Sequence, residues 1–188
     1  MIELVAFLGN PGRKYANTRH NTGRLMAEKL PFFSALQWRH SYKGLYSKID
    51  TVHLLMPETY MNLSGDSIYE GASFFKIPPE RILIVHDELE LPLGQGGLKF
   101  SGGLGGHNGL RSMKSCFNTP DFWRLRIGIG RPDHEDIAGW VLSDFTSEEK
   151  PLLEQTLLVC AEALGRVLSQ GPESLPPEWY KKKILVEK

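Results

Sequence analysis

Residues 2–12 read Ile2-Glu3-Leu4-Val5-Ala6-Phe7-Leu8-Gly9-Asn10-Pro11-Gly12. The apolar run over 2–8 predicts a buried strand. Pro11 fixes φ and Gly12 permits unusual φ, so the chain is predicted to turn sharply after this strand. Because ligands of α/β proteins bind at the carboxyl ends of strands, we expect functional side chains to follow it. An amide, a phenol, a guanidinium and an imidazole do so, namely Asn10, Tyr15, Arg19 and His20. The alternative is an ordinary strand-to-helix turn with a surface histidine.

Strand patterns and helix patterns alternate along the rest of the chain. We expect strands over 2–8, 45–49, 52–55, 82–85, 97–101 and 125–130, and helices over 22–30, 63–76 and 108–117. A further apolar stripe over 153–168 predicts a long helix, which begins with a capping box over 146–149 or at Pro151. Such alternation predicts one α/β domain over 1–188, with a twisted, mostly parallel mixed sheet and helices on both faces. The proline-rich end, residues 171–188, is expected to be mobile in part.

The composition is that of a globular protein, with 41% hydrophobic and 23% charged residues among 188. No apolar run is long enough for a membrane span, and the N-terminus lacks a signal pattern. The two cysteines, Cys116 and Cys160, have no metal-type spacing and form no disulfide framework. These features predict a cytoplasmic chain with reduced thiols, which we expect to be monomeric.

Charge is distributed in blocks although the net charge is zero. Zero net charge argues against a protein that coats nucleic acid non-specifically. Residues 1–50 and 99–131 each carry a net charge of +5, whereas residues 51–98 and 132–188 each carry −5. If the two basic blocks meet, they form a cationic surface beside the loop after the first strand. The alternative is that they are solvated faces.

Three further segments carry recognisable motifs, which are Tyr60-Met61-Asn62-Leu63-Ser64-Gly65, His86-Asp87-Glu88-Leu89-Glu90-Leu91-Pro92 and Gly102-Gly103-Leu104-Gly105-Gly106-His107-Asn108-Gly109-Leu110. These three segments, together with residues 9–12 and 18–21, carry a resemblance to the bacterial peptidyl-tRNA hydrolase family. The resemblance extends from about residue 4 to about residue 131. The resemblance implies hydrolysis of the ester between an N-blocked peptide and the 3′ end of tRNA. It also implies that the chain needs no cofactor and no obligate protein partner. The implied partner is peptidyl-tRNA, bound through its 3′ acceptor end and acceptor stem.

His20 and Asp87 are the candidate catalytic pair. Asp87 follows the expected central strand over 82–85, so it is predicted to lie at the same sheet edge as the loop after the first strand. A carboxylate bound to one ring nitrogen fixes the tautomer and stabilises the imidazolium, which suits a histidine acting as general base on water. The alternatives are an unrelated surface pair, or a metal site that also uses His86 and His107. A covalent nucleophile is disfavoured, since the chain has no Gly-x-Ser-x-Gly motif and Cys116 is expected in mid-helix.

Asn10, Asn62 and Asn108 come from three separate loops, and uncharged amides that converge on one cleft would bind a peptide backbone and an ester carbonyl. The resemblance implies that these positions bind the peptidyl-adenosine end, and that Asn10 also rejects substrates with a free amino group. Helix capping is the alternative role for Asn62 and Asn108. We expect the substrate cleft to be lined also by Tyr15, Tyr60, Met61 and His107.

The glycine-rich loop over 102–108 precedes an expected helix and would favour an oxyanion or an RNA phosphate. It matches neither common nucleotide-binding glycine motif, so a nucleotide cofactor is disfavoured. The loop is one residue shorter than the commoner form of the family, which leaves the phosphate-binding lysine to be assigned. We choose Lys99, with Arg131 as the second basic position. Two other functions stay open: a catalytically silent RNA-binding module on the same fold, and a peptidase-like hydrolase of small N-blocked substrates.

Overall fold

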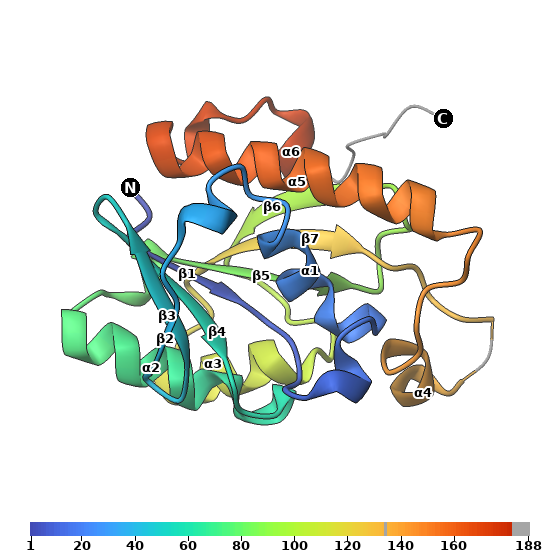
Figure 1. The fold of residues 1–188 in the computed structure, drawn as a ribbon, viewed down its shortest axis with the longest axis horizontal. Helices are drawn as coiled ribbons and strands as arrows, with labels where there is room; N and C mark the ends of the chain where they lie inside the picture. The colour runs from blue at the N-terminus through green and yellow to red at the C-terminus, as the bar shows by residue number, and fades with distance from the viewer. Residues whose placement is uncertain (134, 182–188) are drawn as a thin grey trace.

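The computed structural model describes residues 1–133 and 135–181, and one mixed sheet runs through this part of the chain (Figure 1). Its strand order is β2-β3-β4-β1-β5-β7-β6. The strands are β1 (Leu4–Phe7), β2 (Arg39–Ser41), β3 (Gly44–Ile49), β4 (Val52–Pro57), β5 (Ile82–Glu88), β6 (Gly96–Phe100) and β7 (Trp123–Gly128).

Parallel pairing is concentrated in the centre of the sheet. β4, β1, β5 and β7 are parallel to their neighbours within this group, whereas β2, β3 and β6 join the two edges antiparallel. The predicted mixed sheet is confirmed, with parallel ladders making up half of the described pairings rather than most. The β2–β3 and β3–β4 pairs are antiparallel because short turns join these strands, and β6 adds a third antiparallel pair at the other edge.

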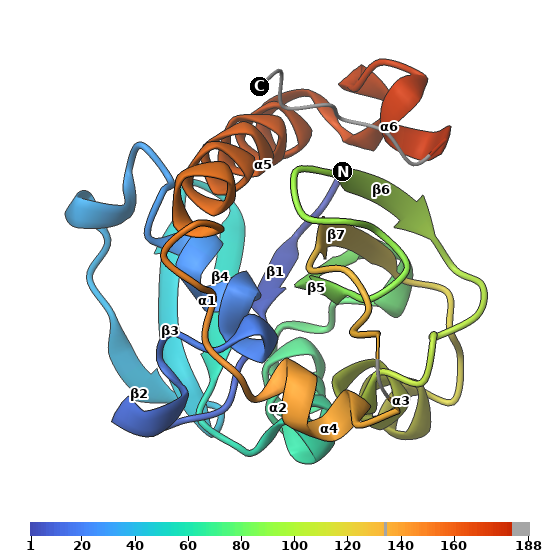
Figure 2. The same ribbon diagram turned by 90° about the vertical axis from the view of Figure 1, so that its right-hand side faces the viewer.

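Two helical layers cover the sheet (Figure 2). Alternate residues of β1 pack toward different layers. Val5 and Phe7 belong to the core beneath α5, while Leu4 and Ala6 belong to the core beneath α2 and α3. The α-helices are α1 (Thr22–Ala27), α2 (Ser64–Phe75), α3 (Asn108–Phe117), α4 (Ile137–Val141), α5 (Lys150–Gln170) and α6 (Glu178–Lys181). The 3₁₀ turns are η1 (Arg13–Tyr15), η2 (Arg19–Asn21), η3 (Phe33–Ala35), η4 (Met61–Leu63), η5 (Pro79–Arg81) and η6 (Pro172–Ser174). No helix in 1–133 or 135–181 is long and apolar enough to cross a membrane.

Most expected elements are present with small shifts at their ends. α3 has the predicted bounds, whereas α1 ends three residues early because i→i−3 bonds at Lys29 and Leu30 tighten the chain into turns. β5 runs on to Glu88 because β7 pairs with it beyond residue 85. The capping box before α5 is confirmed by reciprocal bonds between Thr146 and Glu149.

The end of the described chain packs on the sheet rather than extending into solvent. Leu175 and Trp179 are both buried in the core beneath α5. Apolar burial therefore holds the beginning of the segment that was expected to be mobile. The number of prolines in this segment did not indicate that burial. Residues 182–188, the rest of that segment, lie outside the described residues.

α1 lies directly against the sheet at Gly23. A Cβ at this position would lie 2.5 Å from the carbonyl oxygen of Val85 and 2.8 Å from that of Leu8. These backbone atoms belong to the middle of β5 and to the residue directly after β1, and they cannot move aside like a flexible side chain. The absence of a side chain at Gly23 therefore sets how closely the segment after His20 approaches the sheet.

We expect Gly23→Ala to lower the free energy of unfolding by about 1–3 kcal/mol, because overpacking forces the helix away from the strands. Chemical denaturation measures the change. Gly165→Ala is the matched control: it lies inside α5, and outside the backbone of that helix no atom of residues 1–133 or 135–181 lies within 4 Å of an added Cβ. That variant is expected to gain up to about 1 kcal/mol from helix propensity. Equal effects of the two substitutions would contradict the close approach.

Candidate active site

The predicted pair, His20 and Asp87, meets at the carboxyl ends of β1 and β5. His20 lies in η2, which follows the turn after β1, and Asp87 lies near the end of β5. The Nδ1 atom of His20 is 3.0 Å from each carboxylate oxygen of Asp87. Both side chains are buried, with 9% of His20 and 1% of Asp87 exposed. The geometry is that of a hydrogen-bonded imidazole and carboxylate.

A second imidazole binds the same carboxylate. The Nε2 atom of His107 lies 2.9 Å from Oδ1 of Asp87. The Nδ1 atom of His107 accepts from the backbone N–H groups of Gly109 and Leu110, at 3.1 and 3.4 Å, and so caps α3. A nitrogen that accepts carries no proton, so the proton of His107 lies on Nε2 and points at Asp87.

The pKa of Asp87 reflects this arrangement. Burial alone raises the pKa of the carboxyl group, but the imidazoles of His107 and His20 outweigh burial and hold the pKa well below its usual range. Asp87 is therefore an acceptor throughout the working pH range. Because it can only accept, His20 donates through Nδ1, and its Nε2 atom is left as the basic nitrogen.

His20, Asp87 and His107 open into a cavity of about 360 Å³. Asn108, Arg131 and glycines of the glycine-rich loop form part of its wall. α4, which the sequence did not predict, supplies the opposite apolar wall through Ile137, Ala138 and Val141. The basic nitrogen of the pair thus belongs to a ring beside a cavity large enough for a small ligand.

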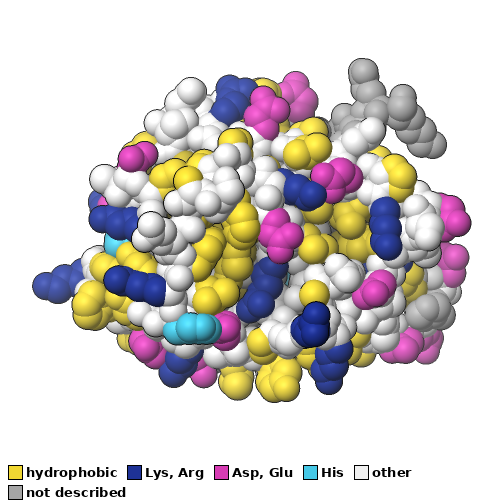
Figure 3. Space-filling view, in the orientation of Figure 1, with side chains coloured by type: hydrophobic (Ala, Val, Ile, Leu, Met, Phe, Trp, Pro, Cys, Tyr) yellow, Lys and Arg dark blue, Asp and Glu magenta, His cyan; other side chains and the backbone are white. Residues whose placement is uncertain are grey.

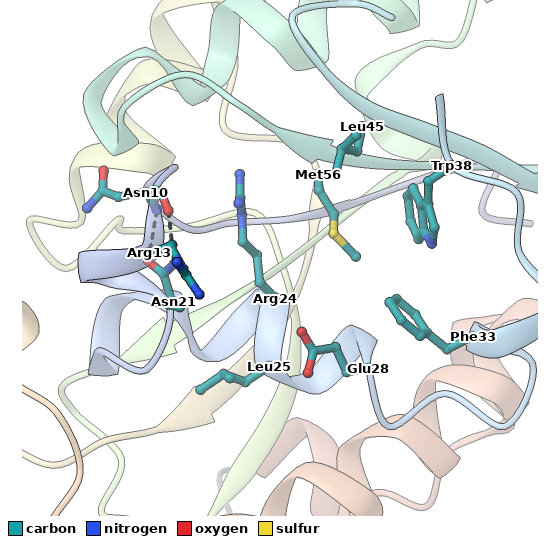
Figure 4. Close-up of a pocket in the computed structure, with 12 residues that line it drawn as sticks. Asn10, Arg13, Asn21, Arg24, Leu25, Glu28, Phe33, Trp38, Leu45 and Met56 are labelled. Atoms are coloured by element: carbon teal, nitrogen blue, oxygen red, sulfur yellow. Dashed lines mark hydrogen bonds between the residues drawn. The ribbon is translucent and has the colours of Figure 1, made fainter. Parts of the chain in front are cut away.

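Asn10 is held by contacts that leave part of its amide for a ligand. Its backbone exchanges two hydrogen bonds with the Asn21 side chain, at 2.8 and 2.9 Å (Figure 4). Its Oδ1 atom accepts from the Met61 N–H at 2.7 Å. Within 1–133 and 135–181, no hydrogen bond to the amide nitrogen of Asn10 is recorded. Asn21 was missed from the sequence, since only the fold shows that it holds the loop carrying Asn10.

The other expected cleft residues come from converging loops. Met61 is buried, and a Cβ added at Gly109 would meet its Sδ atom, so η4 and the start of α3 are in contact. Tyr15 and Tyr60 make an edge contact with ring centroids 6.5 Å apart. Asn62 and Asn108 are exposed. Capping does not explain them, because α2 has no side-chain cap and α3 is capped by His107.

The second basic block, residues 99–131, is only partly at the surface. Arg124 is buried and donates to the carbonyl oxygen of Gly103 in the glycine-rich loop, at 2.8 Å, and to that of Ser101 just before the loop. Arg126 is also buried, with Glu88 3.9 Å away. Arg124 thus supports the loop from within and Arg126 is buried beside Glu88, so the expected cationic surface is smaller than the charge count implied.

Lys99 and Arg131 occupy different places. Lys99 is half-buried on β6, where its stem lies beneath Gly102 of the glycine-rich loop. Arg131 lines the cavity beside His20 and Asp87, and its Nε atom donates to Glu90 at 2.8 Å. Lys99 and Arg131 therefore lie next to different parts of the glycine-rich loop, and one phosphate group need not contact both side chains.

A metal ion could be held by His20, Asp87 and His107, whose ligand atoms lie within 4.8 Å of one another. His86 is not part of this group. It is fully buried, its Nδ1 atom lies 2.6 Å from the Asp87 carbonyl oxygen, and burial lowers its pKa so that it stays neutral. The three candidate ligands already satisfy one another by hydrogen bonds, so the cluster is explained without an ion.

Arg19 anchors the loop after β1, residues 8–21, to the distant Glu149 near the start of α5. Its side chain, 2% exposed, forms a bidentate pair with Glu149 at 2.9 and 2.7 Å. The guanidinium also lies 3.7 Å from the Trp140 ring centroid and 4.7 Å from that of Phe145. Residue 19 directly precedes His20, so this pair fixes the backbone that carries the imidazole. The sequence showed no signal for a partner 130 residues away.

Comparisons with known proteins agree on one family. The family model described as peptidyl-tRNA hydrolase matches residues 4–185. A peptidyl-tRNA hydrolase from Desulfitobacterium hafniense is 47% identical over 161 residues, which cover 83% of this chain and 87% of the relative. One from Treponema pallidum is 42% identical and covers 98% and 97%. The crystal structure of peptidyl-tRNA hydrolase from Acinetobacter baumannii superposes with a TM-score of 0.84 at 39% identity, covering 92% of each chain.

Glu149→Gln is expected to destabilise the fold by about 1.5–3 kcal/mol at neutral pH, because the buried Arg19 guanidinium loses its charged partner. Burial tends to raise the pKa of Glu149, but bonds from Arg19 and Thr146 lower it overall. A depressed folded pKa stabilises the fold above the unfolded pKa, and that stability is lost as pH falls through the folded pKa. The difference between wild type and variant should therefore shrink below about pH 4.3.

Denaturant unfolding from pH 3 to pH 7 measures this difference. Glu154→Gln is the control, since Glu154 pairs with Lys29 at the surface and its loss should cost no more than about 1 kcal/mol. A Glu149→Gln effect that is as small as this, or that grows as the pH falls, would contradict the anchoring role of Arg19.

Proposed function

The chain belongs to the peptidyl-tRNA hydrolase family, and we propose that His20 is the general base of its reaction, with Asp87 as the orienting carboxylate. The activity is that of the family, hydrolysis of the ester bond of peptidyl-tRNA. The observation that carries the proposed mechanism is the His20 Nδ1–Asp87 contact of 3.0 Å, which leaves Nε2 as the basic nitrogen. Asp87 lies within β5 and His20 follows β1, so rigid elements support both groups.

The reaction follows from this geometry. The Nε2 atom of His20 takes a proton from water as the water oxygen attacks the ester carbonyl. Asp87 stabilises the imidazolium through Nδ1. The ester C–O bond then breaks as the same proton passes to the leaving 3′-oxygen of the tRNA ribose, which releases free tRNA. The new carboxylic acid of the peptide loses the second water proton to solvent and becomes a carboxylate.

We propose that amides bind the peptide end of the substrate. The amide nitrogen of Asn10 can donate to the esterified residue, and Asn62 and Asn108 offer exposed amides from two other loops. Substrates with a free, charged amino group would bring a cation to a site where the Asn10 oxygen is already used by Met61. This supports a preference for N-blocked peptides.

We propose that the RNA is held by stacking and by phosphate contacts. Tyr60, with 57% of its surface exposed, offers a face for a base beside Tyr15. Lys99 and Arg131 are the proposed phosphate contacts on either side of the glycine-rich loop. The chain is further proposed to act as a single-domain monomer in the cytoplasm without a cofactor.

His20→Ala should lower kcat by about 10²–10⁴ while folding and tRNA binding stay unchanged, since a general base acts only in the transition state. The measurement is peptide release from N-acetyl-aminoacyl-tRNA. His40→Ala is the control, because His40 is an exposed histidine on β2 paired with Glu58. If the His20 variant keeps more than about a tenth of wild-type kcat, the base is another group.

The same assay with EDTA decides the metal alternative. A water mechanism that rests on His20 and Asp87 keeps its rate after dialysis against the chelator. Loss of activity that zinc restores would instead assign the three-residue cluster to a metal ion. A folded wild-type chain that binds tRNA without hydrolysis would favour the silent RNA-binding module.

Asp87→Asn should lower kcat by about 10²–10⁴, because an amide favours the wrong His20 tautomer and does not stabilise the imidazolium. The acid limb of the pH–rate profile should also move to lower pH. Asp66→Asn is a matched control on α2, where the carboxylate contacts Cys116 instead of a histidine. A profile with unchanged height and position would rule out the pairing.

A further inference from the structure

A second cavity, of about 490 Å³, adjoins the loop that carries Asn10. Asn21 lines it, whereas His20, the residue before Asn21, lines the catalytic cavity. The Asn10 backbone and the Asn21 side chain form one wall (Figure 4). The two cavities therefore lie next to the same short turn of chain, and a ligand bound at Asn10 can extend into the second one.

The opposite wall and the roof are apolar. Phe33 and Trp38 come from η3 and the segment after it, Leu45 and Met56 come from β3 and β4, and Leu25 comes from α1. The space-filling view shows hydrophobic side chains exposed in a hollow at the centre of this face (Figure 3). Apolar walls of this extent, with a volume inside the range of about 300–1,000 Å³, are typical of a ligand site.

Two buried N–H donors in this lining have no hydrogen-bond partner among the described residues. They are Nε of Arg24 and Nε1 of Trp38. Arg24 uses its Nη2 atom to donate to the Pro57 carbonyl oxygen, so the guanidinium is held in place. Buried donors without partners are unfavourable, and a ligand with carbonyl groups would satisfy them.

We propose that this cavity binds the peptide residues that precede the esterified one, with a preference for apolar side chains. The inference rests on the proposed function, which places the esterified residue at Asn10. Upstream residues of a peptide bring apolar side chains and carbonyl oxygens, which match the walls and the unpaired N–H groups. An RNA strand would instead bring phosphates. The cations Arg13 and Arg24 share the cavity lining with the carboxylate of Glu28, which disfavours a phosphate there.

The test compares three tRNAs that carry the same esterified residue. The first has this residue N-acetylated, and the other two carry N-acetyl-Leu-Leu or N-acetyl-Gly-Gly before it. Wild type should show kcat/KM about 10-fold or more higher for the Leu-Leu substrate than for the Gly-Gly substrate, the discrimination expected of an apolar pocket. Trp38→Ala should bring this ratio close to one.

Phe74→Ala is the matched control, because Phe74 is an exposed aromatic residue on α2, far from this lining. It should keep the wild-type ratio. If Trp38→Ala does not fold, Phe33→Ala serves in its place, since its ring lines the same cavity. Lack of a Leu-Leu preference in wild type would overturn the proposal. So would an equal loss on all three substrates in the Trp38 variant, which would indicate an RNA contact. Failure of wild type on the N-acetyl-aminoacyl substrate alone would instead contradict the proposed function.

Discussion

One buried carboxylate that accepts from two imidazoles is the interaction on which the site depends. Asp87 cannot be solvated by water at 1% exposure, so His20 and His107 must satisfy it. Each imidazole in turn belongs to a different loop. The loop after β1 and the start of α3 are thus tied to the end of β5 by the same charge. This single constraint orients His20 and brings His107, which caps α3, and the glycine-rich loop to the cavity.

The central sheet was predictable because its strands are continuous apolar runs. Residues 82–85 are buried on both faces, and such runs have few other folded uses. Short elements were not predictable. β2 has three residues and α4 has five, so neither contains a full hydrophobic period. They form because tertiary contacts hold them, as with the Trp140 indole N–H that donates to the Gly130 carbonyl oxygen.

For the candidate site, the sequence identified several side chains but not all of the contacts that they make. His20 and Asp87 were paired from their places after two expected strands together with the family resemblance, and the fold does bring them together. His107 was expected at the substrate, whereas both of its ring nitrogens are used by Asp87 and α3. Arg124 was counted as surface charge, although it is buried under the glycine-rich loop. A count of charged residues along the sequence does not show which cations are buried inside the protein.

The pair between Arg19 and Glu149 has a consequence for the order in which the chain folds. During synthesis the N-terminal part leaves the ribosome first, so β1 and the catalytic loop are present long before residue 149. Until that carboxylate arrives, the Arg19 guanidinium has no charged partner and its burial is opposed. The loop after β1 can therefore become fully ordered only after the start of α5 has emerged, and a nascent chain stopped before that point holds every proposed catalytic group without the ion pair that fixes the backbone next to His20.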